Sequence, residues 1–224
     1  VNFAWAQILR IATMHRMLDM YGALPYSQIS SDKLSTPYDT MEEAYHAMFT
    51  DLTDAINVMT VYVTENPNNR TMAKYDKVYD GDFEKWVKFA NSLKLRMAIR
   101  IRFADREYAR QMAEEAINHS IGVITSNEDN ATSLGTKNQL YTVLVQWPDQ
   151  CVSADITSYM KGYNDPRMSK YFKKKTSDKG DDDYVGMRAG LSYGNDITGP
   201  TFSRINVGEM DRTLWMSAAE TAFN

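Results

Sequence analysis

Apolar residues recur every three or four positions through much of residues 3–122, the spacing that places side chains on one face of an α-helix. This pattern predicts four helices, at residues 3–21, about 41–60, 83–103 and about 106–119. Residue types that start or stop helices lie at their ends. These are Thr40 with Glu43 as a capping box, Asp82 and Asp105 as N-caps, and Gly22 and Gly122 as stops.

The helical spacing is weaker after residue 122. Two short helices are predicted, one at residues 153–161 and one that starts at Asp165 and Pro166 and ends near Phe172. The β-branched run at residues 140–145 is typical of a strand or an extended packing segment. We expect the glycine-rich residues 176–204 to form a long loop region with room for one hairpin, and residues 214–223 to begin a further helix.

These elements indicate a mainly α fold in which the first helix pairs with the second and the third with the fourth. The first and third helices start much further apart than the roughly 34 residues of a tetratricopeptide repeat, so irregular tetratricopeptide-like helix pairs with long loops are expected. Val1 and Asn224 both fall inside helical patterns, which suggests one domain truncated at both ends. Its expected parts are a helical core at about 3–122, a loop-rich binding-face region at about 123–210 and the start of a further helix at 211–224.

The charge balance argues against two classes of partner. The net charge is −4 and the lysines and arginines are scattered, whereas nucleic acids and anionic membranes both require a basic patch. No stretch of about 20 apolar residues is present that could span a membrane as a helix. Cys151 is the single cysteine, so no disulfide can form within the chain, and a buried, inert thiol is expected.

Few residues are arranged for catalysis or metal binding. His15, His46 and His119 fall on three separate predicted helices and lack the paired spacing of a zinc site. No glycine-rich phosphate loop and no Gly-x-Ser-x-Gly motif occurs, so we predict no catalytic residue, no metal and no cofactor. Glu43 and Glu220 come closest to apolar runs, but capping explains the first, and a helix surface or interhelix hydrogen bond explains the second. Glycoside hydrolysis needs only two carboxylates and stays open as an alternative.

The chain contains 14 tyrosines and 4 tryptophans, a mild excess that bears on ligand class. Sugars present flat apolar faces, and an aromatic ring with a polar tip can pack beneath such a face. Trp5 and Trp86 lie in apolar helix patterns and are expected to be buried. Trp147, in a loop-like stretch, and Tyr184 and Tyr193, in the glycine-rich loop, are predicted to form a shallow ligand-binding patch.

Five segments of the chain carry recognisable motifs. Residues 6–28 form a predicted helix that ends in Tyr-Gly before Pro-Tyr, residues 51–56 read DLTDAI, and residues 86–101 read WVKFANSLKLRMAIRI. The other two segments are YMKGYNDPRMSKYF at residues 159–172 and LWMSAAETAFN at residues 214–224. In this order the five segments resemble the SusD/RagB-type family of nutrient-binding surface lipoproteins of Bacteroidetes outer membranes, and residues 86–101 are the closest match, to the Trp-x-Lys-Phe-Ala-Asn-Ser-Leu-x-Leu-Arg motif of one SusD-like branch.

The resemblance implies a SusD-like fold, with tetratricopeptide-like helix pairs and irregular loops on one face. It implies a binding protein and not an enzyme, held at the surface of the outer membrane by a lipid anchor outside the sequence given. Such proteins pair with a SusC-like TonB-dependent transporter and deliver glycan or peptide to it. The family's ligand contacts lie on variable loops, so no ligand-binding residue is carried over, and Asn91, Arg96 and Arg100 of the matched third helix are expected to be structural.

A second class of function stays open beside ligand capture. A helical stack can also act as a scaffold that binds proteins through its concave face. A signal peptide with a lipid-attachment cysteine in the upstream sequence would favour the surface-binding protein, and a cytosolic start would favour the scaffold. Turnover of a polysaccharide that is lost on changing one acid would favour the hydrolase.

Overall fold

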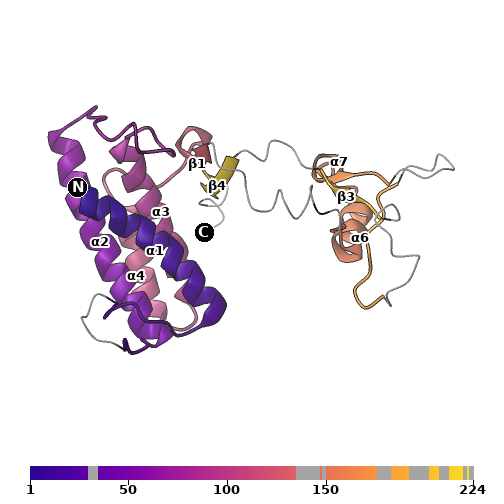
Figure 1. The fold of residues 1–224 in the computed structure, drawn as a ribbon, viewed down its shortest axis with the longest axis horizontal. Coiled ribbons are helices and arrows are strands. Elements are labelled where there is room, and N and C mark those ends of the chain that lie inside the picture. The colour runs from indigo at the N-terminus through magenta and orange to yellow at the C-terminus, as the bar shows by residue number, and fades with distance from the viewer. Residues whose placement is uncertain are drawn as a thin grey trace. The chain divides into compact units, whose positions relative to one another are not determined.

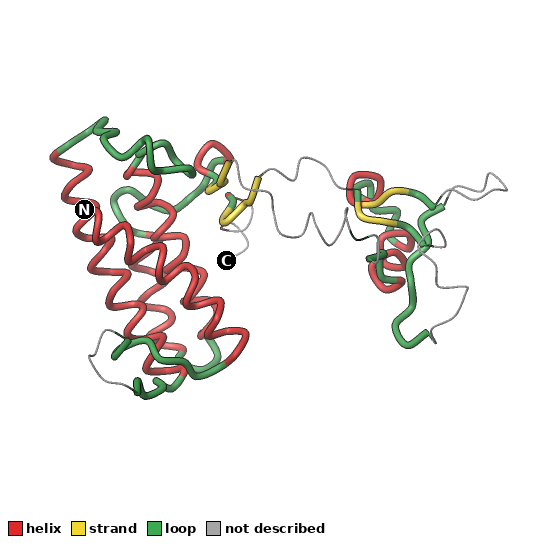
Figure 2. Tube along the Cα trace, in the orientation of Figure 1, coloured by secondary structure: helices red, strands yellow, loops and turns green. Residues whose placement is uncertain are grey.

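A computed structural model describes residues 1–29, 35–134, 147, 150–175, 183–191, 202–206, 212–218 and 221. The chain divides into two compact units (Figure 1 and Figure 2). Residues 1–133 and 214–224 form one, here called the helical unit, and residues 134–213 form the other, here called the small unit. The expected strand or extended segment at residues 140–145 lies outside the described residues.

The helical unit is built from four helices that pack in chain order, α1 on α2, α2 on α3 and α3 on α4 (Figure 1). Their bounds are Asn2–Tyr21 for α1, Met41–Glu65 for α2, Phe83–Ile101 for α3 and Arg106–Ile117 for α4. The prediction of a mainly α fold made of packed helix pairs is confirmed.

Helix ends fall where the sequence supplies a group for the unpaired backbone of the first or last turn. The Glu43 N–H donates to Thr40 Oγ1 over 3.2 Å, and the Thr40 N–H donates to Glu43 Oε2 over 2.8 Å, which is the predicted capping box. Asp82 and Asp105 accept hydrogen bonds from backbone N–H groups in the first turns of α3 and α4, as predicted. Gly22 ends α1 with φ 80°, a conformation that glycine adopts without strain.

The second helix continues past its predicted end near Thr60 and stops at Glu65. Residues 61–65 include β-branched valines, which have only moderate helix propensity. The Tyr62 ring packs edge-on against Phe83 at the start of α3, with ring centroids 5.8 Å apart. Packing against the third helix therefore extends α2 beyond its sequence pattern.

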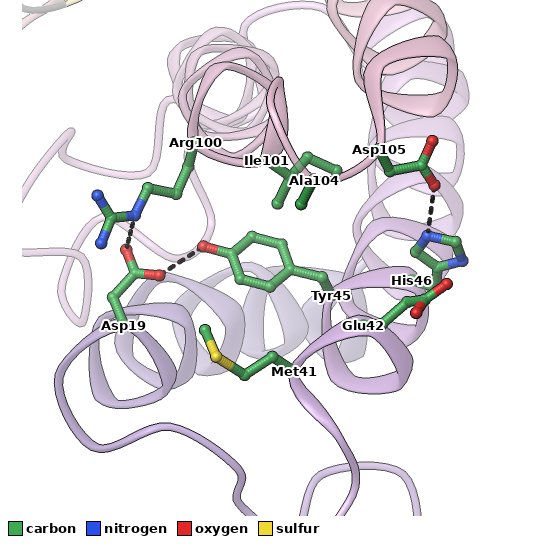
Figure 3. A pocket seen from close by; sticks show the side chains of 9 residues that line it. All are labelled: Asp19, Met41, Glu42, Tyr45, His46, Arg100, Ile101, Ala104 and Asp105. Atoms are coloured by element: carbon green, nitrogen blue, oxygen red, sulfur yellow. Dashed lines mark hydrogen bonds and ion pairs between the residues drawn. The ribbon is translucent and has the colours of Figure 1, made fainter.

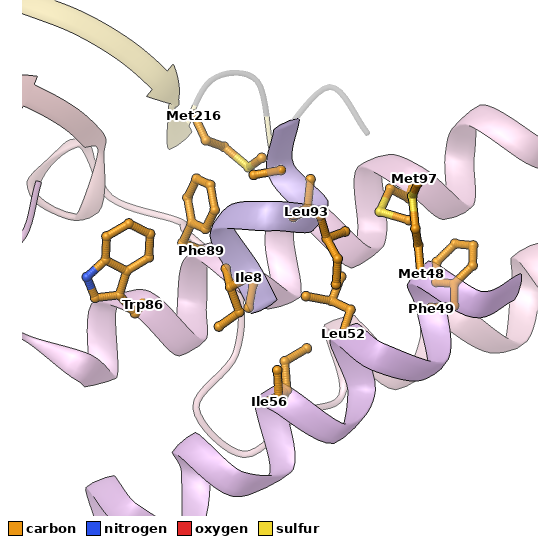
Figure 4. Close-up of a cluster of buried hydrophobic side chains, with 14 of the residues drawn as sticks. Ile8, Met48, Phe49, Leu52, Ile56, Trp86, Phe89, Leu93, Met97 and Met216 are labelled. Atoms are coloured by element: carbon orange, nitrogen blue, oxygen red, sulfur yellow. The ribbon is translucent and has the colours of Figure 1, made fainter. Parts of the chain in front are cut away.

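One hydrophobic core lies between the helices of this unit (Figure 4). Trp86 is 1% exposed, which confirms its predicted burial, whereas Trp5 is only half-buried. The Trp5 ring lies edge-on to both Phe83 and Trp86, with centroids 5.6 Å apart in each pair. The fully buried side chains that fill the core include Ile8, Ile11, Leu18, Met48, Phe49, Leu52, Met59, Phe89, Leu93 and Met97.

Two buried polar side chains of this unit satisfy backbone groups. Asn91 on α3 donates from Nδ2 to the carbonyl oxygen of Gly122 over 3.0 Å, the structural role expected for it. Asp76 is 1% exposed and accepts from the N–H groups of Val78 and Gly81 and from Trp86 Nε1 over 2.8–3.0 Å. Its carboxylate therefore fixes the irregular loop before α3 to the core.

The end of the chain does not begin with the predicted helix. Residues Arg212–Met216 form strand β4, which pairs with strand β1 at Ala131–Leu134. A short 3₁₀ turn at Asn127–Asp129 precedes β1. Helical backbone is found only from Ala218 onward among the described residues. Met216 is 1% exposed in the core of the helical unit, so pairing and burial override the helical pattern that begins at Leu214.

The small unit contains helix α6 at Ala154–Gly162, helix α7 at Met168–Tyr171, and strands β2 at Phe172–Lys173 and β3 at Arg204–Ile205. The two strands pair antiparallel, with Phe172 opposite Ile205. Ser153 Oγ accepts from the Asp155 N–H and caps α6 as predicted. Helix α7 is shorter than the helix predicted from Asp165 to near Phe172. Residues 165–167 form a turn instead, in which Asp165 accepts hydrogen bonds from the Arg167 N–H and guanidinium.

The core of the small unit consists of Val152, Met160, Met168 and Phe172, with Tyr184 packed against it. Gly186 passes so close to Ser153 and Thr157 that a Cβ atom would overlap both residues. Cys151 is half-buried, with Sγ 3.6 Å from Met187 Sδ, so the expected buried position of this thiol is wrong.

Candidate functional site

The three aromatic residues predicted to bind ligand have different surroundings. Trp147 is 60% exposed, as a stacking ring requires. Tyr184 is half-buried because its ring packs against the core of the small unit, and Lys174 Nζ lies 5.9 Å from the ring centroid. Tyr193 lies outside the described residues. No ring contact or hydrogen bond joins Trp147 to Tyr184 in the described part of the chain, so their assembly into one patch stays a prediction.

Sequence reasoning missed an exposed aromatic face formed by α6 and by Tyr163, the residue directly after it. Ile156, Tyr159 and Tyr163 follow one another at helical spacings of three and four residues and are 43%, 67% and 81% exposed. The neighbouring face of α6 buries Thr157 and Met160. This 3–4 spacing is visible in the sequence and is the signal that points to these residues.

A pocket of about 420 Å³ lies in the helical unit where four helix ends meet (Figure 3). We call it the helix-end pocket. Residues from the end of α1, the start of α2, the end of α3 and the α3–α4 connection enclose it. The lining residues are Asp19, Met41, Glu42, Tyr45, His46, Arg100, Ile101, Ala104 and Asp105.

One wall of the helix-end pocket carries a three-residue network (Figure 3). Tyr45 donates its hydroxyl hydrogen to Asp19 Oδ1 over 2.6 Å, and Arg100 Nε lies 3.3 Å from Asp19 Oδ2. Burial, followed by the hydrogen bond to Asp19, raises the pKa of Tyr45 above its usual value. Tyr45 therefore stays a neutral donor, and the ion pair with Asp19 is consistent with the structural role expected for Arg100.

The opposite wall is held by His46 and Asp105 (Figure 3). His46 Nε2 lies 3.3 Å from Asp105 Oδ2, and its ring lies against Tyr108 with centroids 4.2 Å apart. Asp105 Oδ1 accepts from the Tyr108 N–H and so also caps α4. The two polar walls are separated by the side chains of Met41 and Ile101, which makes the pocket apolar in its middle.

Two findings concern metals and membranes. No group of three or more His, Cys, Asp or Glu side chains that could hold a metal ion occurs within the residues that the structure describes. In the same part of the chain, no helix combines the length and apolar character needed to cross a membrane.

The acid closest to a catalytic candidate is held in its ionised form. Hydrogen bonds from the Thr40 N–H and hydroxyl lower the pKa of Glu43, whereas a general acid near neutral pH needs a raised pKa. The capping role predicted for Glu43 accounts for its position. Glu220 lies outside the described residues.

The packed helix pairs place the chain among mainly α proteins built from successive antiparallel helices. Residues 1–224 match the SusD-like family, described as Susd and RagB outer membrane lipoproteins. The chain belongs to this family, and the expected resemblance is confirmed over its whole length. None of the curated proteins matches the chain.

Several solved structures are similar to this chain. A chitin-binding SusD homolog from Flavobacterium johnsoniae is 35% identical, with a TM-score of 0.89 over 99% of this chain. A SusD homolog from Bacteroides uniformis is 43% identical, with a TM-score of 0.84 over 100% of it. A SusD-like protein from Bacteroides thetaiotaomicron is 35% identical, with a TM-score of 0.86. This chain spans 46% of the length of each.

Proposed function

We propose that this chain is part of a surface nutrient-binding lipoprotein that captures a glycan and delivers it to a SusC-like TonB-dependent transporter. The observation that carries the proposal is the family match along residues 1–224, joined to 35% identity with a chitin-binding SusD homolog. A second relative, described as a chitin-binding protein, is 26% identical with a TM-score of 0.79. A glycan is therefore the first ligand class to test, and a peptide is the second.

The proposed binding face lies in the loop-rich region at residues 123–210. Trp147, Tyr184 and Tyr193 are its proposed contacts, and Tyr159 and Tyr163 join them. Exposure supports this role for Trp147 and for the tyrosines of α6, because a ring must reach solvent to pack beneath a sugar. Tyr184 has part of its surface in the small core, so it would contact ligand only with the remainder.

The ligand is proposed to be bound and released without cleavage. The family to which the chain belongs consists of binding proteins, which supports this part of the proposal. Incubation of the purified protein with labelled chitin oligosaccharides is expected to leave their length unchanged. Shortened products that disappear when one acidic residue is replaced would support a hydrolase instead.

Titration of the intact protein with chitin oligosaccharides, alongside unrelated oligosaccharides and peptides, tests ligand class. Trp147→Ala is expected to weaken the affinity for the bound oligosaccharide roughly tenfold, because an exposed aromatic ring that stacks on ligand is a typical binding hot spot. Tyr75→Ala, at an exposed tyrosine of the helical unit, is the matched control and should leave affinity unchanged. Equal affinities for Trp147→Ala and the unchanged protein would remove Trp147 from the site.

The proposed partner is tested by affinity purification of the full-length protein from native outer membranes. A large TonB-dependent transporter is expected among the co-purifying proteins. Recovery of cytosolic proteins without any transporter would contradict uptake and favour the helical scaffold.

A further inference from the structure

The helix-end pocket has features of a binding site that the aromatic face does not share. Its volume of about 420 Å³ falls within the range of roughly 300–1,000 Å³ that is common for small-ligand sites. All of its lining residues belong to the helical unit. It therefore requires its own explanation, independent of any sugar bound to the small unit.

Negative charge prevails on the side chains that line this pocket. Asp19, Glu42 and Asp105 contribute three carboxylates, whereas Arg100 is the one lining residue that is always cationic. The guanidinium of Arg100 already faces Asp19 through Nε. Glu42 is exposed at the rim and takes part in no ion pair with another described residue. Hydrogen-bond acceptors thus outnumber donors, and a ligand that fits carries donors.

The middle of the pocket is apolar and sets the second requirement. Met41 is 45% exposed, and Ile101 and Ala104 also leave part of their surface open to solvent. The Tyr45 ring lies between the two polar walls (Figure 3). Burial of these groups by a ligand is favourable only if the ligand brings an alkyl or aromatic surface.

We infer that the helix-end pocket binds an amphipathic cation, a positively charged head on an alkyl stem, as in the side chain of lysine or arginine. The stem packs on Met41 and Ile101 while the head reaches the carboxylates at the rim. A charge-assisted hydrogen bond to a carboxylate is stronger than one to a neutral acceptor. An anion in the same place would be repelled by the carboxylates, and a neutral sugar would bring no charge opposite that of Glu42.

Capped amino acids test this inference on the intact protein. The protein is titrated with Nα-acetyl-lysine amide, with Nα-acetyl-arginine amide and, for comparison, with Nα-acetyl-norleucine amide, which keeps the alkyl stem and lacks the charge. The two cations are expected to bind roughly tenfold more tightly than norleucine at low salt, as one charge-assisted hydrogen bond provides. Added salt should reduce this difference, since the rim is open to solvent.

Three variants locate the binding. Glu42→Gln is expected to weaken the lysine probe severalfold, and Ala104→Leu to prevent its binding by filling the pocket, because Ala104 is an exposed lining residue. Glu107→Gln is the matched control, since Glu107 is also an exposed acid in the first turn of a helix but lies outside the pocket. It should leave the affinity for the probe unchanged.

The inference is overturned if the lysine probe does not bind, if norleucine binds equally well, or if both pocket variants keep full affinity for lysine. Affinity for oligosaccharide should be the same in Glu42→Gln, Ala104→Leu and the unchanged protein. If the protein binds no glycan, the lysine titration still tests the helix-end pocket. If the lysine probe does not bind, the oligosaccharide titration still tests the proposed function.

Discussion

The described residues of the helical unit include 28 buried hydrophobic residues in one continuous core, whereas those of the small unit include four. Burial of apolar surface is the main favourable term in folding, so the helical unit holds its shape by packing. The small unit relies more on hydrogen bonds between backbone segments. Met187 donates to Val152 O over 2.7 Å, Ala154 donates to Met187 O over 2.8 Å and Ser203 donates to Val185 O over 2.7 Å.

Each unit buries some of its aromatic side chains and exposes others. Trp86 and Phe89 are buried in the helical unit, and neither is available to a ligand. In the small unit, Tyr159 on α6 and Tyr163, the residue directly after α6, are exposed. The helical unit also exposes rings, among them Tyr75 and Phe103, and the small unit buries Phe172, so the units differ in the size of their cores and not in whether they expose aromatic rings.

The largest expected effect comes from the core of the helical unit. Leu52→Ala removes a fully buried side chain and should lower the free energy of unfolding by about 3 kcal/mol, measured by urea denaturation. Val58→Ala, at an exposed position of the same helix, should change it by less than about 0.5 kcal/mol.

Met160→Ala in the small unit should not change the urea midpoint of the helical unit. A shared loss of both units would mean that they unfold together.

Close backbone packing in the small unit offers the next test. Gly186→Ala places a methyl group against Ser153 and Thr157 and should destabilise the small unit by about 2 kcal/mol. Hydrogen exchange should accelerate across residues 150–175 while α2 and α3 keep their protection. Gly162→Ala adds a methyl group where no atom lies within 4 Å and serves as the control. Unchanged exchange in Gly186→Ala would contradict the close approach.

Helix caps allow a like-for-like comparison of the two units. Thr40→Ala should lower the free energy of unfolding by about 1 kcal/mol, because it leaves the Glu43 N–H without its acceptor. Ser153→Ala removes the acceptor for the Asp155 N–H and should be seen as faster hydrogen exchange in α6. Ser158→Ala, at an exposed serine within α6, should not change the exchange rate. Equal exchange in the two serine variants would argue against the cap.

The smallest effect expected is a pH dependence confined to the helical unit. His119 Nδ1 accepts from the Ile121 N–H, and Nε2 lies 3.3 Å from Thr60 Oγ1, whose hydroxyl donates to Ile56 O. The ring is thus held neutral, and burial, followed by the charge of Lys94, lowers its pKa below the ordinary 6.5.

The sign of this effect follows from the order of protonation. As the pH falls below 6.5, the unfolded chain binds a proton at His119 before the folded chain does, so stability falls until the folded histidine is protonated as well. His15, whose pKa is also lowered by burial, acts in the same direction. The free energy of unfolding should drop less between about pH 7.5 and pH 5.5 in His119→Gln than in the unchanged protein, by under about 1 kcal/mol. Parallel pH profiles would rule out a contribution from His119.

Local chemistry explains which parts of the fold were predictable. Asp82, Asp105 and the Thr40–Glu43 pair cap helices through residues two or three positions away, so the sequence alone reveals them. Strand β4 depends on β1, far away along the chain, and no local pattern reports that pairing.

The candidate sites divide in the same way. Exposure of Trp147 was predicted from its loop-like context, and the spacing of Tyr159 and Tyr163 could have been recognised. The partial burial of Tyr184 could not be predicted, because the small core that covers part of its ring is formed by residues from separate segments of the chain. The helix-end pocket combines residues from Asp19 to Asp105, and only the packing of four helices brings them together.

The pairing of β1 with β4 also sets an order of events during protein synthesis. The ribosome synthesises residues 134–213 of the small unit before Met216 leaves the ribosome and can pack into the core of the helical unit. A nascent chain interrupted between these strands lacks that side chain and leaves apolar neighbours uncovered. Such a product resembles a folding intermediate and is a substrate for chaperones and proteases, so only a chain translated through β4 is expected to escape them.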